Sequence, residues 1–243
     1  SATEIALKMS FQYWQQNGFS TKKNFIHLQN GYHGETLGAL SVTDVPLFKQ
    51  IFAPLLRPST AVPTPDWRQS ADGETPYDCA LRAAAALEHY LEQHHADTAA
   101  LILEPLVQGA IGMGMYHPVY LQRARQICDA YQIHLIADEI AVGFGRTGTM
   151  FACEQAEITP DFLCLAKGLS GGYLPLSVVM TNNSIYETFY DDRVSRAFLH
   201  SHSHSGNALA CRAALATLDI FEQDDVLAGN TVKAQFLSEL LQP

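Results

Sequence analysis

The chain has 243 residues, of which 47% are hydrophobic, and carries a formal net charge of −10 at pH 7. This length and apolar fraction are enough for a sizeable α/β core, which excludes a disordered or fibrous chain. The negative charge argues against nucleic acid or an anionic membrane as a partner, because their phosphate groups would be repelled, and leaves small molecules as the expected partners.

The first predicted element is an amphipathic helix from about Glu4 to Gly18, with Ile5, Met9 and Trp14 near one face. No capping residue or initiator methionine precedes it. A second helical pattern, in residues 231–243, runs to the last residue. We therefore expect the chain to be an internal fragment of a longer protein, with residues 1–243 forming one domain.

Between these ends, short apolar runs alternate with longer segments of helical periodicity. The runs predicted to be strands are residues 25–29, 99–104, 133–138, 162–166 and 176–181. Helical spacing recurs in residues 77–93 and 118–131. Buried strands separated by helices predict a three-layer α/β/α domain with a mostly parallel sheet. Residues 44–76 hold six prolines and are predicted to form a long surface connection.

Three ionisable side chains follow predicted strands directly: Glu104, Asp138 and Lys167. Each of them, taken alone, is more simply interpreted as a surface residue at the start of a loop. Ligands of parallel sheets bind at the carboxyl ends of strands, however, so together these groups predict a site. Lys167 precedes the flexible sequence GLSGG. A lysine in apolar, partly dry surroundings loses its proton readily, which suits bond formation with an aldehyde.

The sequence around these groups resembles a known family. LIADEIAVGFGRTG at 135–148, then PDFLCLAKGLSGG at 160–172, with Lys167 29 positions after Asp138, is similar to the core of the class III aminotransferases that use pyridoxal phosphate. The resemblance implies the large domain of a fold type I transferase, without its N-terminal segment and C-terminal small domain. It also implies a homodimer with active sites shared between the subunits.

Four further segments narrow the resemblance within this class. They are NGYHGET, ILEPLVQGAIGMGMYHP, MFACEQAEITPD and LHSHSHSGNALACRAAL. These segments are similar to members that transfer an amino group from S-adenosylmethionine to 8-amino-7-oxononanoate in biotin synthesis. Two alternatives remain open at this point: another class III aminotransferase acting on ω-amino acids or ornithine, and a non-catalytic homologue that binds the cofactor.

The resemblance implies roles for the residues nearest the cofactor. Asp138 would keep the pyridine nitrogen protonated, which makes the ring an electron sink. Lys167 would hold the cofactor covalently and then move a proton between the substrate and cofactor carbons. Tyr32 would cover one face of the ring and border the substrate, and Ile140 would cover the other face. His33, in the same turn as Tyr32, would also contact the cofactor.

Other contacts are implied less directly. Glu104 matches a glutamate near the cofactor that affects substrate preference in the class. Glu35 stands where relatives often have aspartate, and it would contact the amine of the donor. Arg146 would bind the carboxylate of an acidic substrate. Glu139 has a weaker case, and we expect a structural role for it.

Residues 200–207, HSHSHSGN, allow two interpretations. His200, His202 and His204 alternate, so on an extended strand they would face one side and could bind a metal. No carboxylate or cysteine is close in sequence, and the segment opens the helical pattern at 208–218, which favours a phosphate instead. The resemblance assigns His202 and Ser203 to the cofactor phosphate of the neighbouring subunit and Ser201 to the border of the substrate.

Cysteine spacing and hydropathy indicate the compartment in which the protein works and argue against some classes of protein. The five cysteines show no CxxC spacing, which argues against a disulfide framework or a zinc knuckle and favours the reducing cytoplasm. We find neither a signal-peptide pattern nor an apolar run of about 18 residues that would predict a membrane span. A nicotinamide dehydrogenase fits poorly, because no GxGxxG sequence follows the first strand.

Overall fold

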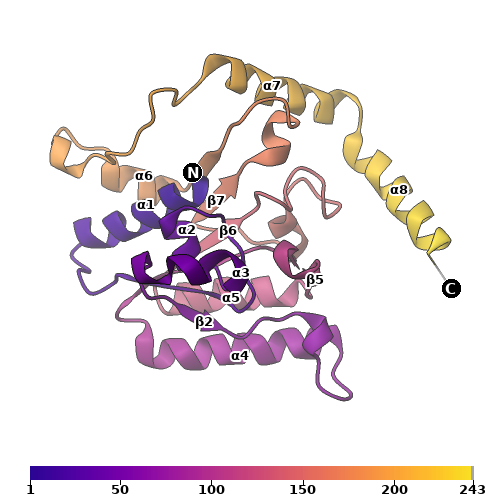
Figure 1. Ribbon diagram of the computed structural model, residues 1–243, viewed down its shortest axis with the longest axis horizontal. Helices are drawn as coiled ribbons and strands as arrows, with labels where there is room; N and C mark the ends of the chain where they lie inside the picture. Colours follow the sequence, from indigo (N-terminus) through magenta and orange to yellow (C-terminus); the bar gives the residue numbers. More distant parts are fainter. Residues whose placement is uncertain (242–243) are drawn as a thin grey trace.

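The computed structural model describes residues 1–241, which form a six-stranded sheet covered by helices on both faces (Figure 1). The strand order is β2-β1-β3-β6-β7-β8, and only β8 is antiparallel to its neighbour. The strands of this sheet are β1 (Asn24–Leu28), β2 (Thr60–Val62), β3 (Thr98–Leu103), β6 (His134–Asp138), β7 (Phe162–Leu165) and β8 (Val178–Thr181). The predicted α/β class with a mostly parallel sheet is confirmed.

The two faces of the sheet contribute to two separate cores, because successive side chains of a strand point in opposite directions. In β3, Leu101 and Leu103 pack into the core under α4 (Pro76–His94) and α5 (Val119–Ala130). Ala100 and Ile102 face the core under α1 (Ala2–Gln16) and α6 (Asn183–Phe189). All of β3 is buried, as its unbroken apolar sequence predicts.

The longest helix, α4, shows how local sequence sets an element that supports the sheet. Thr75 accepts a hydrogen bond from the Asp78 N–H, and the Asp78 carboxylate accepts one from the Thr75 N–H. This capping box, with Pro76 in the first turn, fixes the start of the helix. Its alanine- and leucine-rich face is buried against the sheet.

Shorter elements connect the layers, and two helices lie at the end of the chain. The connecting elements are α2 (Leu37–Ser41), α3 (Pro46–Lys49), the hairpin β4 (Val107–Gln108) and β5 (Gly114–Met115), and the 3-10 helices η1 (Gln50–Leu55), η2 (Trp67–Gln69), η3 (Gly109–Ile111), η4 (Ala152–Ala156), η5 (Lys167–Ser170) and η6 (Val194–Arg196). The last two helices are α7 (Ala208–Gln223) and α8 (Val226–Leu240). Helix α8 extends away from the body of the molecule and has no buried residue (Figure 1). The last two residues of the predicted helical segment 231–243 lie outside the described residues.

The prediction for residues 44–76 was incomplete. This segment contains β2 as well as α3, and β2 pairs in parallel with β1 at the edge of the sheet. The strand is only three residues long and lies between Pro58 and Pro63, so its sequence shows no alternation long enough to predict it. The connection is therefore part of the sheet, although most of it lies on the surface.

Two properties predicted from composition can be compared with the fold. Among residues 1–241, no helix combines the length and apolar character needed to cross a bilayer. All five cysteines, Cys79, Cys128, Cys153, Cys164 and Cys211, are free thiols, and only Cys211 is exposed.

Candidate active site

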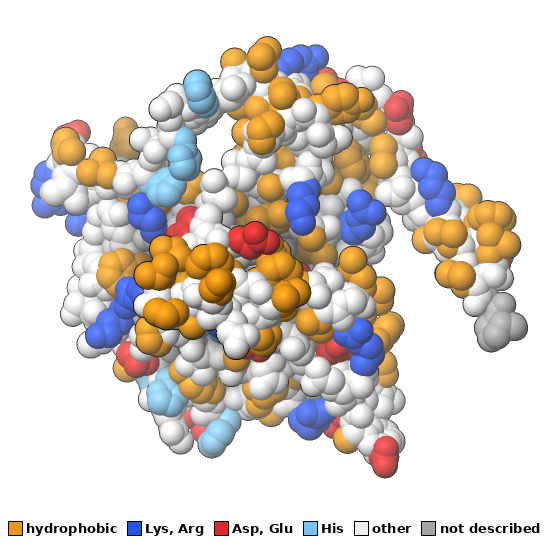
Figure 2. Space-filling model, viewed as in Figure 1, with side chains coloured by type: hydrophobic (Ala, Val, Ile, Leu, Met, Phe, Trp, Pro, Cys, Tyr) orange, Lys and Arg blue, Asp and Glu red, His pale blue; other side chains and the backbone are white. Residues whose placement is uncertain are grey.

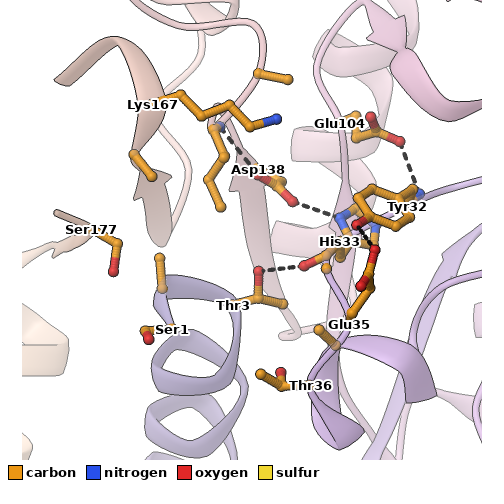
Figure 3. A pocket seen from close by; sticks show the side chains of 16 residues that line it. Ser1, Thr3, Tyr32, His33, Glu35, Thr36, Glu104, Asp138, Lys167 and Ser177 are labelled. Carbon is orange, nitrogen blue, oxygen red and sulfur yellow. Dashed lines mark hydrogen bonds and ion pairs between the residues drawn. The ribbon is translucent and has the colours of Figure 1, made fainter. Parts of the chain in front are cut away.

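A cavity of about 290 Å³ lies at the carboxyl ends of β1, β3, β6 and β7 (Figure 3). The chain leaves these neighbouring strands at the same edge of the sheet, so residues distant in sequence converge there. Seven residues predicted for the site line the cavity: Tyr32, His33, Glu35, Glu104, Asp138, Ile140 and Lys167. The predicted convergence of Asp138 and Lys167 on one cavity is therefore observed.

Asp138 is the last residue of β6 and is fixed by two donors. Its Oδ1 accepts a hydrogen bond from the Ile140 N–H at 3.1 Å, and its Oδ2 lies 2.8 Å from His33 Nδ1. The carboxylate is only 5% exposed. Burial of a carboxylate is costly unless hydrogen bonds satisfy it, and here both oxygens have a partner. The side chain is thus held in one orientation at the floor of the cavity.

Lys167 begins η5, directly after β7 and Ala166, and has a left-handed backbone with a φ of +47°. Such a conformation is unfavourable for a residue with a Cβ, and strained backbone of this kind tends to cluster at functional sites. Tight packing follows it: a Cβ on Gly168 would lie 2.8 Å from the Cβ of Phe144, so only glycine fits. Packing around Gly168 therefore helps to fix the backbone turn from which the Lys167 side chain reaches the cavity.

Lys167 is exposed in this chain, although it lines the cavity. The dry surroundings expected for its amine are therefore not present in the single chain and stay a prediction for the whole protein.

Glu104 follows β3 and ties two loops to the cavity. One carboxylate oxygen accepts a hydrogen bond from the Tyr32 N–H and the other from the Gly109 N–H, both at 3.0 Å. Burial raises the pKa of Glu104, and these two hydrogen bonds act in the opposite direction. Glu104 therefore fixes the backbone that carries Tyr32, in addition to lining the cavity.

Tyr32 and Glu35 form one wall of the cavity. The Tyr32 hydroxyl donates a hydrogen bond to the Glu35 carboxylate at 2.9 Å, and the Tyr32 ring packs at 5.0 Å from the ring of Phe48. Burial, and then the hydrogen bond to Glu35, raise the pKa of Tyr32. The phenol is thus a neutral, oriented aromatic group at neutral pH. Ile140 also lines the cavity and supplies an apolar surface.

Glu139, next to Asp138, has the structural role that we expected. It is fully buried, and its two oxygens accept hydrogen bonds from the Ala152 N–H at 2.9 Å and the Cys153 N–H at 2.8 Å. Burial raises the pKa of Glu139, against the effect of these bonds. The Glu139 side chain therefore connects the two ends of the loop formed by residues 140–151.

Four predicted residues do not reach this cavity. Arg146 is exposed on the loop that Glu139 closes, and Ser201, His202 and Ser203 lie in an exposed turn before α7. Their predicted contacts with substrate, or with the cofactor of a neighbouring subunit, stay predictions.

The alternating histidines do not form an extended strand: the segment forms a turn, and His200 Nδ1 lies 3.0 Å from Lys8 Nζ. Among residues 1–241, no three His, Cys, Asp or Glu side chains are grouped so that they could hold a metal.

The contribution of the first helix to the cavity was not predicted. Ser1, Ala2 and Thr3, in the first turn of α1, line it, as do Thr36 and Ser177. The helical pattern from Glu4 was visible in the sequence, but the point in the fold at which its first turn would lie was not.

Comparisons with known proteins agree with this site. The profile of the family described as Aminotransferase class-III matches residues 1–243. A curated relative from Helicobacter pylori, named adenosylmethionine-8-amino-7-oxononanoate aminotransferase, is 49% identical over 100% of this chain and 54% of its own length. A relative of the same name from Geobacter sulfurreducens is 42% identical over the same shares. The chain spans about half the length of the curated relatives it matches.

Solved structures give the same result. The adenosylmethionine-8-amino-7-oxononanoate aminotransferase of Methanocaldococcus jannaschii superposes with a TM-score of 0.90 at 36% identity, over 99% of this chain and 53% of that one. An amine transaminase of an uncultivated Pseudomonas species, solved with PLP bound, superposes with a TM-score of 0.91 at 37% identity, over 98% and 55%. The fold is that of the fold type I PLP-dependent transaminases. With an amine and a carboxylate facing one cavity and the family profile matching its whole length, the chain belongs to the class III aminotransferases.

Proposed function

We propose that the protein containing this chain transfers the amino group of S-adenosylmethionine to 8-amino-7-oxononanoate, using pyridoxal phosphate, in the cytoplasm. The observation that carries the proposal is the placement of Lys167 and Asp138 in one cavity at the ends of β7 and β6. The donor and acceptor are those in the name shared by the relatives from H. pylori and G. sulfurreducens. Four buried free thiols are consistent with a reducing compartment.

The residues present fit pyridoxal phosphate. Lys167 supplies an amine for its aldehyde, Asp138 a fixed carboxylate for its ring nitrogen, and Tyr32 and Ile140 an aromatic and an aliphatic surface for its ring. Ser1, Ala2 and Thr3 line the same cavity. When bound, the cofactor provides an electron sink for charge that develops on a substrate carbon.

The chain's own groups then have distinct tasks. Asp138 would accept a hydrogen bond from the ring nitrogen and favour its protonated form, and its contacts with the Ile140 N–H and His33 Nδ1 keep the carboxylate oriented. Lys167 Nζ would hold the cofactor and would move the proton of the reacting substrate carbon. Glu35, held by the Tyr32 hydroxyl, presents a carboxylate that suits a cationic amine of the substrate.

A second candidate is another class III aminotransferase, favoured by the similarity to the amine transaminase. We expect S-adenosylmethionine to change the visible absorption of the PLP-loaded full-length protein at least about ten-fold faster than ornithine or an ω-amino acid. Stopped-flow absorbance with each donor at equal concentration measures these rates. A faster reaction with the ω-amino acid or ornithine would replace the first proposal by the second.

We further propose that the protein is a homodimer whose active sites lie between the subunits. Apolar side chains gather on the face over α2 and α3 (Figure 2). Leu47, Ile51 and Leu55 are 85%, 81% and 66% exposed, in the segment that also packs Phe48 against the cavity residue Tyr32. Exposed apolar clusters of this kind are typical of protein interfaces. The turn with His202 and Ser203 is exposed and does not line the cavity of its own chain, so it is accessible to a neighbouring one.

Changing Ile51 to glutamate should raise the dimer dissociation constant of the full-length protein at least about ten-fold, because a charge would have to be buried without a partner. Sedimentation velocity over a range of concentrations measures this constant. Tyr77→Glu is the control, since Tyr77 is 46% exposed at the start of α4, on the opposite face of the sheet. If both variants dimerise as the unchanged protein does, this surface is not the interface.

A further inference from the structure

A buried amide joins the ends of three strands beside the candidate active site. Gln108, on the segment that leaves β3, has a fully buried side chain. Its Nε2 donates a hydrogen bond to the Gln29 carbonyl, just after β1, at 2.9 Å. Its Oε1 accepts a hydrogen bond from Thr64 Oγ1, just after β2, at 2.5 Å. Gln108 does not line the cavity, so any effect that it has on a ligand must pass through other residues.

The partners of this amide determine which of its two ends carries the hydrogens. A main-chain carbonyl can only accept, so the end of Gln108 that faces Gln29 is the NH₂ group. Thr64 Oγ1 lies 3.3 Å from the Asp66 N–H and accepts from it, and its own hydrogen points to Gln108 Oε1. Turning the amide by half a rotation would set two oxygens against each other at Gln29. The side chain therefore has one favourable orientation.

The bond from Gln108 is one of two that the segment after β3 makes with the loop of residues 29–32. The second is the bond from the Tyr32 N–H to Glu104 at 3.0 Å. Glu104 also accepts a hydrogen bond from the N–H of Gly109, the residue after Gln108, at 3.0 Å. The carboxylate and the amide are thus held relative to each other, and together they fix the loop at its first and last residues.

Tyr32 connects this loop to the cavity. Its ring lines the cavity, and its hydroxyl holds the Glu35 carboxylate there (Figure 3). We infer that Gln108 is a positioning residue, which sets the place of the Tyr32 ring and of Glu35 by fixing the main chain at Gln29. The inference deepens the proposed function and rests on it for the substrate that these two side chains would meet. Lys167 and Asp138 follow other strands, so loss of the amide should affect substrate binding more than chemistry.

The first measurement is amide hydrogen exchange of the full-length protein without cofactor, by mass spectrometry of peptides that cover residues 29–35. We expect Gln108→Leu to speed exchange in this segment about ten-fold or more, because the loop loses one of its two attachments and the Gln29 carbonyl loses its partner. Peptides from β6 and β7 should exchange as they do in the unchanged protein.

The second measurement is the KM of the PLP-loaded protein for S-adenosylmethionine. We expect Gln108→Leu to raise KM about ten-fold and to leave kcat within about three-fold. In a Tyr32→Ala background the same substitution should change KM by less than about two-fold, because a residue that acts through Tyr32 then has nothing to position. A role in stability alone would give no such dependence on Tyr32.

Lys22→Met is the matched control. Lys22 is 4% exposed, and its Nζ donates to the carbonyls of His95 and Thr98 at 2.8 Å and 3.1 Å, at the opposite end of β3. This change also removes two buried hydrogen bonds, so it should lower the free energy of unfolding about as much as Gln108→Leu. Exchange in residues 29–35 and KM should stay those of the unchanged protein.

A milder pair of variants applies if Gln108→Leu does not fold. Thr64→Val removes one of the two partners of the amide and should speed exchange in residues 29–35 about three-fold, whereas Thr64→Ser keeps the hydroxyl and should not. Equal exchange rates in these two variants would contradict the inference.

Three other results would overturn it: unchanged exchange in Gln108→Leu, an equal change in Lys22→Met, or a rise of KM that is the same with and without Tyr32. If only an ω-amino acid reacts, the proposed donor falls and KM is measured with that donor instead. Faster exchange in a protein with which no amino donor reacts would overturn the proposed function and leave the hold of Gln108 on the loop standing.

Discussion

Replacing Lys167 with alanine is expected to lower kcat of the full-length protein by about 10⁴-fold or more. In the proposed function the amine both anchors the cofactor and moves the substrate proton, so both tasks would be lost together. Its backbone has a φ of +47°, and Gly168, the next residue, lies so close to Phe144 that a Cβ there would not fit. The cavity itself should persist in the variant.

Borohydride treatment followed by peptide mass spectrometry measures the anchor, and single-turnover kinetics measure the proton transfer. Lys23→Ala is the control, because Lys23 is exposed and does not line this cavity. A stable adduct at another lysine, or near-normal turnover in Lys167→Ala, would contradict the assigned role. Absence of an adduct in the unchanged protein would favour the non-catalytic homologue.

Replacing Asp138 with asparagine is expected to lower kcat by about 10³-fold with little change in the fold. Asparagine has the same shape, and its amide oxygen can still accept the Ile140 N–H, but it carries no charge to keep the ring nitrogen protonated. The loss should appear in kcat more than in KM, because the charge acts on the reacting complex.

The matched control for this change is Asp161→Asn. The Asp161 carboxylate accepts hydrogen bonds from the Leu135 N–H and from Arg125, both at 2.8 Å, outside the cavity. This variant should lower the free energy of unfolding, measured in urea, while kcat stays near that of the unchanged protein. Equal losses of kcat in the two variants would mean that Asp138 acts through stability alone.

Local sequence was sufficient to predict most of the sheet. The strands β1, β3, β6, β7 and β8 each begin within two residues of their predicted start, because each is a short, continuous apolar run. The edge strand β2 was missed, since three residues between prolines contain too little pattern. The antiparallel direction of β8 also had no local signal, because strand direction depends on the path of the connecting chain.

For the site too, some features could be predicted from local sequence and others could not. Asp138 and Lys167 were predicted from their positions at the ends of buried strands and from the family resemblance, and both line the cavity. The contact between His33 and Asp138 had no sequence signal, because it joins segments far apart along the chain. The exposure of the Lys167 side chain also had no sequence signal, because it depends on which segments of the fold pack around that side chain.

The sequence alone determined the class of fold, the family, and the presence of a carboxylate and an amine at the ends of two buried strands, because strand patterns and motifs are properties of neighbouring residues. Only the tertiary structure decided which residues meet at the cavity, which atom of Asp138 is held by His33, and that Arg146 and the turn at 201–203 lie away from it. These are distances between points remote along the chain, and packing sets them.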